Sequence, residues 1–127
     1  GGPRLVIAAR ARTSVQPKSV AVSPDGSRVV VCNFGRVDTD NVWIYDALTL
    51  DHLGTVDFPG NGVESAFSPD GRTLYVSNFQ RHLVEVIDFE SLTVRAEVAV
   101  GRHPKTIAVS GARPKMLVIF RTSSFCA

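Results

Sequence analysis

An internal repeat of 42 to 45 residues constrains the fold of this chain more than any other feature of its sequence. The Ser-Pro-Asp-Gly segment at 23–26 recurs 45 positions later, at 68–71. After a three-residue insertion in the first copy the offset becomes 42, so that 42–46 aligns with 84–88. Repeats of this length are typical of proteins built from stacked supersecondary units.

Each copy of the repeat contains strand-sized segments separated by turn-forming residues, and a third copy opens at 104–110 with a match to 17–23. Ser-Pro-Asp-Gly predicts a tight turn, because proline presets φ and glycine accepts the positive φ of a hairpin. The flanking segments are rich in β-branched residues and predict strands. The predicted strands are 20–23, 28–33, 42–46 and 52–58 in the first copy, 65–68, 73–78, 83–88 and 94–100 in the second, and 107–110 and 115–120 in the third.

This pattern predicts an all-β chain of β-propeller blades, each a four-stranded antiparallel sheet. We expect 1–16 to end a preceding blade, with outer strands in 4–11, and 17–61 and 62–103 to form two blades. Residues 104–127 then begin a further, degenerate blade, because Gly-Ala-Arg at 111–113 replaces the Pro-Asp-Gly of the other copies.

About three blades do not close a ring, since full propellers have about four to eight. We therefore expect the chain to be part of a larger propeller of the seven-bladed type. The alternatives are closure of a ring by self-association and an independent open stack, and the open stack would leave large apolar faces uncovered.

The repeat also resembles a known family over about residues 17–110. Its pattern of small residues, S-P-D-G, V-x-N-F and V-x-[IV]-x-D resembles the YVTN-type repeats of YncE-like and surface-layer β-propellers. These repeats are similar in turn to those of seven-bladed lactonase-like propellers. The resemblance implies the propeller fold and a location in the periplasm, outside the cell or on the cell surface.

Composition and charge argue against several partners. The net charge is only +2 and the basic residues are scattered, so no nucleic-acid partner is expected. No apolar run approaches about 18 residues, so no transmembrane segment is expected. Cys32 and Cys126 lie far apart, which leaves open two small buried side chains, a disulfide or a reactive thiol. No cofactor or metal set is evident.

Binding residues are expected on the propeller face that carries the loops between second and third strands and the crossovers between blades, because loops on a rigid scaffold carry function. The candidates are Arg36, Glu64, Arg81, His82, Arg102, His103 and Lys105. Among the crossover residues, Lys18, Glu64, His103 and Lys105 should lie nearest the central channel. Arg36 and Arg81 occupy equivalent positions, where they either form an anion-facing ring or are solvated or blade-bridging arginines. Asn33 and Asn78 end strands and are expected to bond loop backbone.

No catalytic residues are assigned, because no nucleophile elbow, phosphate-binding loop or zinc motif occurs. The sequence therefore favours a binding or scaffold module without catalysis, with an unidentified small molecule or protein as ligand. Other blades of the same propeller are the expected partners within the fold. The alternatives are a lactonase-like propeller enzyme that hydrolyses a sugar lactone, and a propeller domain of a periplasmic redox protein.

Overall fold

The computed structural model describes residues 2–111 and 116–120, and these residues form ten strands and no helix. The first antiparallel sheet contains β1 (Pro17–Val22), β2 (Arg28–Asn33), β3 (Val42–Asp46) and β4 (His52–Val56), in that order. The second contains β5 (Gly62–Phe67), β6 (Thr73–Asn78), β7 (Leu83–Asp88) and β8 (Thr93–Ala99). The strands β9 (Pro104–Val109) and β10 (Met116–Phe120) form a two-stranded sheet. The all-β prediction is confirmed for the described residues.

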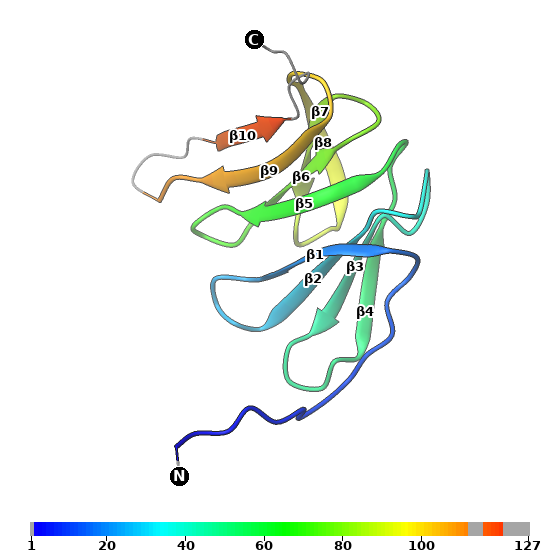
Figure 1. Cartoon of the computed structure of the whole chain (residues 1–127). Helices are drawn as coiled ribbons and strands as arrows, with labels where there is room; N and C mark the ends of the chain where they lie inside the picture. Colours follow the sequence, from blue (N-terminus) through cyan, green and yellow to red (C-terminus); the bar gives the residue numbers. More distant parts are fainter. Residues whose placement is uncertain (1, 112–115, 121–127) are drawn as a thin grey trace.

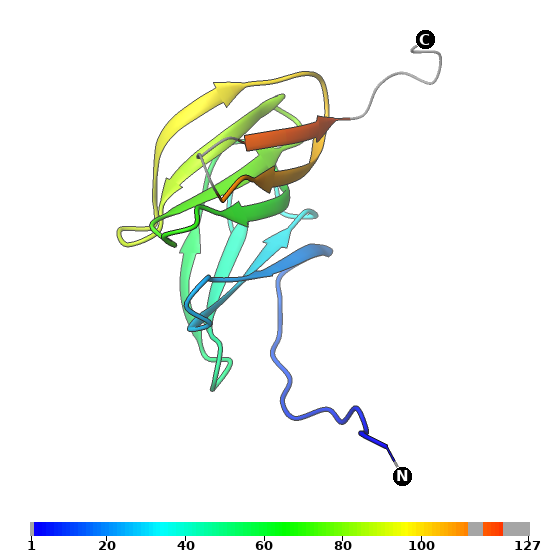
Figure 2. The same ribbon diagram turned by 90° about the vertical axis from the view of Figure 1, so that its left-hand side faces the viewer.

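The two four-stranded sheets lie face to face, with β1, β5 and β9 side by side along one edge (Figures 1 and 2). The predicted first and last residues of the strands β2, β3, β6 and β7 are all confirmed. The inner strands are the first strand of each sheet, β1, β5 and β9, and they begin three residues earlier than predicted. In β1 and β5 this is because Pro17 already pairs with Asn33, and Gly62 with Asn78, before a bulge. This early pairing brings the crossover residues into the strands themselves.

The Ser-Pro-Asp-Gly turns between β1 and β2 and between β5 and β6 are held by their own side chains. In the first turn Ser23 Oγ donates to Asp25 Oδ1 at 2.7 Å and accepts from the backbone N–H of Arg28 at 3.0 Å. Hydrogen bonds from Ser23 and Ser27 lower the pKa of Asp25 to about 2. Gly26 has a φ of 77°, which explains the glycine. The polar residues of this motif therefore serve the turn.

The hydrophobic core lies between the two facing sheets. The first sheet and the segment after it contribute Val30, Cys32, Val42, Ile44, Val56 and Phe58, and the second sheet contributes Leu74, Val76 and Ile87. All of these side chains are buried. Alternate residues of a strand point to opposite faces, so each sheet also presents a second face. In the second sheet Val84 and Val86 lie on that other face and are buried as well.

Cys32 belongs to this core, and its burial predicts an unreactive thiol. It is fully buried, and burial raises the pKa of its thiol from 9.0 to about 11. Because the thiolate is the nucleophile, a rise of this size lowers its fraction about 100-fold. In a Cys126→Ser variant we expect iodoacetamide to label Cys32 at least about 100-fold more slowly than free cysteine, followed by mass spectrometry. Labelling at the rate of free cysteine in the folded protein would contradict this assignment. Cys126 lies outside the described residues.

The N-terminal segment differs from the prediction. Residues 2–13 contain no strand, whereas outer strands were expected in 4–11. No strand of the described chain pairs with them, and an isolated strand lacks partners for its backbone groups. The segment runs away from the first sheet (Figure 1), held near its end where Tyr45 Oη donates to the carbonyl of Arg12 at 2.6 Å. The assignment of 1–16 to a preceding blade stays a prediction.

Candidate functional site

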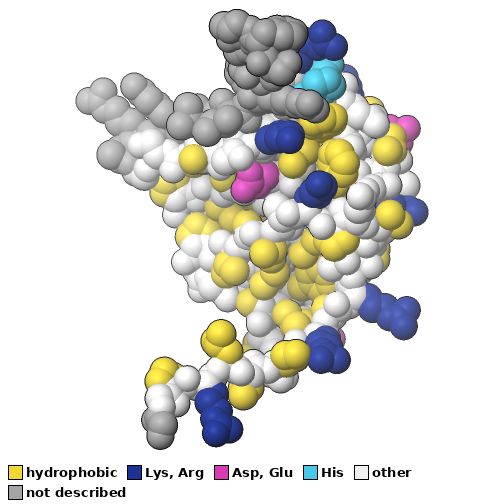
Figure 3. All heavy atoms as spheres, viewed as in Figure 1, with side chains coloured by type: hydrophobic (Ala, Val, Ile, Leu, Met, Phe, Trp, Pro, Cys, Tyr) yellow, Lys and Arg dark blue, Asp and Glu magenta, His cyan; other side chains and the backbone are white. Residues whose placement is uncertain are grey.

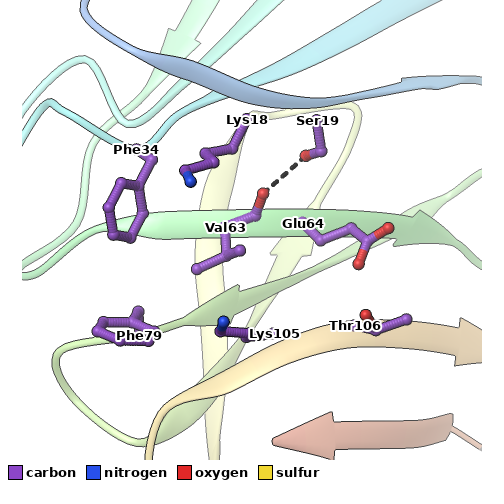
Figure 4. A pocket seen from close by; sticks show the side chains of 8 residues that line it. All are labelled: Lys18, Ser19, Phe34, Val63, Glu64, Phe79, Lys105 and Thr106. Atoms are coloured by element: carbon purple, nitrogen blue, oxygen red, sulfur yellow. Dashed lines mark hydrogen bonds between the residues drawn. The ribbon is translucent and has the colours of Figure 1, made fainter. Parts of the chain in front are cut away.

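A hollow of about 330 Å³ opens where the three inner strands β1, β5 and β9 lie side by side. It is lined by Lys18, Ser19, Phe34, Val63, Glu64, Phe79, Lys105 and Thr106 (Figure 4). The face that carries the inner strands shows basic and acidic side chains around exposed hydrophobic ones (Figure 3). The volume is at the lower end of the range for small-molecule sites, about 300–1,000 Å³.

The lining residues occupy equivalent positions of the repeat. Lys18 on β1, Val63 on β5 and Lys105 on β9 are each the second residue of their strand. The third residues of the same strands are Ser19, Glu64 and Thr106. Phe34 and Phe79 each follow the asparagine that ends a second strand. Stacking the repeats therefore brings together side chains that are more than 80 residues apart in the sequence.

Serine hydroxyl groups hold the inner strands at fixed separations. No backbone ladder joins β1 to β5 or β5 to β9. Ser19 Oγ donates to the carbonyl of Val63 at 2.8 Å, across the gap between β1 and β5. Ser77 Oγ donates to the carbonyl of Lys105 at 2.6 Å, across the gap between β6 and β9. These bonds satisfy carbonyl groups that a sheet would otherwise pair, and they fix the backbone beneath the hollow.

Two phenylalanine rings form one wall of the hollow. The rings of Phe34 and Phe79 meet edge to face, with centroids 5.6 Å apart. The buried Asn61 holds both, since its Nδ2 donates to the carbonyl of Phe34 at 3.2 Å and its carbonyl accepts from the N–H of Phe79 at 3.0 Å. The ammonium group of Lys18 lies 5.2 Å from the centroid of the Phe34 ring, within range of a cation–π interaction.

Charge is distributed unevenly in the hollow. Lys18 and Lys105 form no ion pair within 4.0 Å among the described residues, where the ion pairs involve Arg28, Arg36 and Arg81. Figure 4 shows both lysine side chains at the end with the phenylalanines, while the carboxylate of Glu64 points to the other end, towards Thr106. One end is therefore basic and aromatic, and the other is acidic and hydroxylic.

The two histidines predicted as binding residues lie behind this wall. The His103 ring stacks on Phe79, with centroids 4.4 Å apart and 23° between the planes. Its backbone N–H donates to His82 Nδ1 at 3.0 Å. Neither histidine lines the hollow. In the described structure His103 therefore supports Phe79 from outside the hollow, and its place near the central channel stays a prediction.

The predicted arginines also lie outside the hollow. Arg36 Nη2 pairs with Asp40 Oδ2 at 3.0 Å, and Arg81 Nη1 pairs with Glu97 Oε2 at 2.7 Å. Arg102 is exposed on the crossover to β9. Both equivalent arginines thus pair with carboxylates of their own blade, Arg36 with Asp40 and Arg81 with Glu97.

Of the seven residues predicted to bind ligand, the structure brings Glu64 and Lys105 to the hollow, together with Lys18. Sequence reasoning did not identify Phe34 and Phe79 as lining residues. Their shared position after the strand-ending asparagine was the signal that could have found them. The predicted role of Asn33 and Asn78 is confirmed, because each donates to a loop carbonyl.

Sequence reasoning also missed a buried acid, Glu85 on β7. Its side chain is fully buried, opposite Val76 and Glu97 in the strand register. Burial, followed by the neighbouring Glu97 carboxylate, raises the pKa of Glu85 from 4.5 to about 8. The pKa of Glu97 is lowered, mainly by its hydrogen bond with Glu85. A protonated Glu85 donating to an ionised Glu97 accounts for both directions.

Within the described residues, no three His, Cys, Asp or Glu side chains lie close enough to hold a metal ion. The same part of the chain has no helix with the length and apolar character needed to cross a membrane.

Comparison with known proteins identifies the architecture. No family model matches the chain, and no curated protein matches it. Solved structures do match, and they are propeller proteins. The chain has a β-propeller architecture. Each of its two four-stranded sheets is a blade, and the assignment of β9 and β10 to a further blade stays a prediction.

Three of these structures show how much of a propeller the chain represents. Hydrazine synthase of Kuenenia stuttgartiensis matches with 30% identity and a TM-score of 0.70, over 84% of this chain and 30% of that one. Dihydro-heme d1 dehydrogenase NirN matches with 22% identity and a TM-score of 0.72, over 90% and 25%. A Bacteroides uniformis protein provisionally named as a 6-phosphogluconolactonase matches with 18% identity and a TM-score of 0.67, over 85% and 34%. The chain thus spans about a third or less of each, and the last two likenesses concern the fold alone.

Proposed function

We propose that this chain is a binding part of a β-propeller, and that it holds its ligand in the hollow between β1, β5 and β9 without transforming it. The observation that supports this most directly is the composition of the hollow. Two lysines that form no ion pair within the described part of the chain, a glutamate and two phenylalanines can bind a small molecule from several sides. Specific sites of this kind combine apolar walls with a few polar groups that orient the ligand.

The chemistry of the lining residues argues for binding and against catalysis. A nucleophilic serine needs a base that accepts its proton, and the hydroxyl of Ser19 donates to the backbone carbonyl of Val63. No histidine or cysteine among the residues that the structure describes lines the hollow. Glu64 is half-buried and has no second acid within the lining set. General acid–base catalysis by a pair of side chains therefore has no support here.

We assign the chain to the YVTN and YncE-like type of repeat on the motif resemblance, and we place it in the periplasm or at the cell surface on the same basis. The ligand belongs to the whole propeller, to which other blades would contribute further loops. Ring closure with blades of the same protein or with other copies of the chain is part of this proposal. The molecular mass in solution distinguishes a ring closed by blades of the same protein from a ring closed by several copies of the chain.

A fragment screen monitored by backbone amide spectra tests the proposed function. We expect fragments to shift the amide signals of Ser19, Glu64 and Lys105, while the turns around Asp25 and Asp70 on the opposite face stay unshifted. We also expect glucono-δ-lactone to hydrolyse at the same rate with and without the protein. The proposal fails if no fragment shifts these signals. It also fails if the protein accelerates hydrolysis and Glu64→Gln abolishes the acceleration.

A further inference from the structure

We infer that the hollow selects an organic anion with a flat aromatic body, whose anionic group lies at Lys18 and Lys105 and whose ring lies against Phe34 and Phe79. This inference rests on the proposed function and specifies its ligand. An aryl carboxylate or an aryl phosphate has the required chemistry, because a lysine ammonium group attracts both as a point charge.

The first step of the argument is the uncompensated positive charge. Lys18 and Lys105 lie at equivalent positions of β1 and β9, the two strands that flank β5 in the hollow. At this position β5 carries Val63, which contributes no charge between them. The only carboxylate in the lining set is that of Glu64, and it points to the other end (Figure 4). Arg36 and Arg81, which lie outside the hollow, are paired with carboxylates, whereas Lys18 and Lys105 form no ion pair among the described residues.

The second step is the rigid aromatic wall beside the two lysines. Phe34 and Phe79 are half-buried, so part of each ring faces the hollow. Asn61 bonds the backbone of both residues, and the stacked ring of His103 supports Phe79 from behind. An edge-to-face pair held in this way offers a ring surface to a third aromatic group without losing side-chain entropy on binding.

The third step is the relation between the charge and the wall. Lys18 already lies over the ring of Phe34, with its ammonium group 5.2 Å from the centroid. An anion bound there is next to an aromatic surface, so a ligand with both groups gains both contacts. A hollow of about 330 Å³ accommodates one small ring system. A cation would meet two like charges at this end, and a bare anion would leave the wall unused.

The test uses the whole chain and three probes, 2-naphthoate, 2-naphthamide and inorganic phosphate, with affinities from amide shift titrations. We expect 2-naphthoate to bind at least about 10-fold more tightly than either of the others, and its affinity to fall as salt is raised. Lys18→Gln and Lys105→Gln should each weaken 2-naphthoate about 5-fold while leaving 2-naphthamide unchanged. Phe34→Leu should weaken 2-naphthoate and leave phosphate unchanged.

Arg72→Gln is the matched control, because it removes the same charge from an exposed position on the β5–β6 turn. We expect it to leave 2-naphthoate binding within about 2-fold of the original protein. Equal binding of 2-naphthoate and 2-naphthamide in the original protein, independent of salt, overturns the anion part but leaves the proposed function standing. Equal binding of phosphate and 2-naphthoate overturns the aromatic part. If no probe and no fragment shifts the amide signals of the residues that line the hollow, the proposed function fails as well.

Discussion

Replacing Glu85 with glutamine is expected to raise the free energy of unfolding at pH 8 by about 2–3 kcal/mol, with little change at pH 4.5. Glu85 is a fully buried acid on β7, and the residues of this strand from Leu83 to Ile87 are all buried. Neither of its carboxylate oxygens accepts a hydrogen bond from the described residues. The nearest cation, Arg81 Nη1, is 3.9 Å from Oε1 and is already bound to Glu97 at 2.7 Å.

The sign of this effect follows from the raised pKa. In the unfolded chain Glu85 ionises near pH 4.5, whereas in the folded protein it keeps its proton to about pH 8. Between these values the folded state binds more protons than the unfolded state, so stability falls as pH rises through this window. The full pKa shift corresponds to a loss of roughly 4 kcal/mol or more in the free energy of unfolding at pH 8. Relaxation of the structure around the charge reduces this loss. The amide of glutamine stays neutral at every pH and still donates to Glu97.

Glu97 acts in a different pH range. Its pKa lies below the ordinary value of 4.5, so its contribution is complete above about pH 4.5 and is lost only as pH falls further. Arg81 is the other charged group beside Glu85. The fall in stability between pH 5 and pH 8 is therefore assigned to Glu85.

Urea unfolding at pH 4.5, 6 and 8 measures the effect. Glu90→Gln, an exposed glutamate on the β7–β8 loop, is the matched control and should change stability by less than about 0.5 kcal/mol at each pH. If Glu85→Gln is no more stable than the original protein at pH 8, the carboxyl group is not held as described.

Replacing Asn78 with alanine is expected to lower the free energy of unfolding by about 2–3 kcal/mol. Asn78 ends β6 and is fully buried. Its Nδ2 donates to the carbonyl of Pro59 at 2.7 Å, and its Oδ1 accepts from the N–H groups of Arg81 at 3.2 Å and Asn61 at 3.3 Å. Alanine leaves these buried backbone groups without partners, and each such group costs about 1 kcal/mol or more.

The repeat provides a matched control at the equivalent position, Asn33. It is also fully buried at the end of a second strand. Its Nδ2 donates to the carbonyl of Asp40 at 3.1 Å, but its Oδ1 accepts no hydrogen bond in the described structure. Asn33→Ala removes the same volume and fewer bonds, so we expect a loss of only about 1 kcal/mol. Urea unfolding at one pH compares the two, and equal losses would show that the bonds to Asn78 are not what stabilises the crossover.

We expect the loss of the Asn78 hydrogen bonds to disturb the lining of the hollow as well. Asn61, whose N–H donates one of these bonds to Asn78 Oδ1, holds the backbone of Phe34 and Phe79. Gly60 contacts the Asn78 side chain so closely that an added Cβ would lie 2.5 Å from its Oδ1. The crossover from the first blade to the second is therefore built around this asparagine, and the aromatic wall depends on it.

Local sequence patterns predicted the strands well, because strand formation depends on features that short segments contain. The β-branched runs at β2, β3, β6 and β7 and the Ser-Pro-Asp-Gly turns act within a few residues. The segment before β1 was mispredicted for the complementary reason. Its apolar residues resemble a strand, but a strand also requires a partner, and none is present in the described residues.

The sequence by itself determined the repeat, the blade architecture and the side of the propeller on which Lys18, Glu64 and Lys105 lie. All three follow from spacing along one chain, because equivalent positions of stacked repeats lie at equivalent positions of neighbouring blades. The tertiary structure alone decided that these residues meet Phe34 and Phe79 in one hollow, and that Arg36 and Arg81 pair with carboxylates outside it. It also decided that Glu85 is buried. These outcomes depend on which side chains of neighbouring blades face one another, and that is set by packing between segments far apart in the sequence.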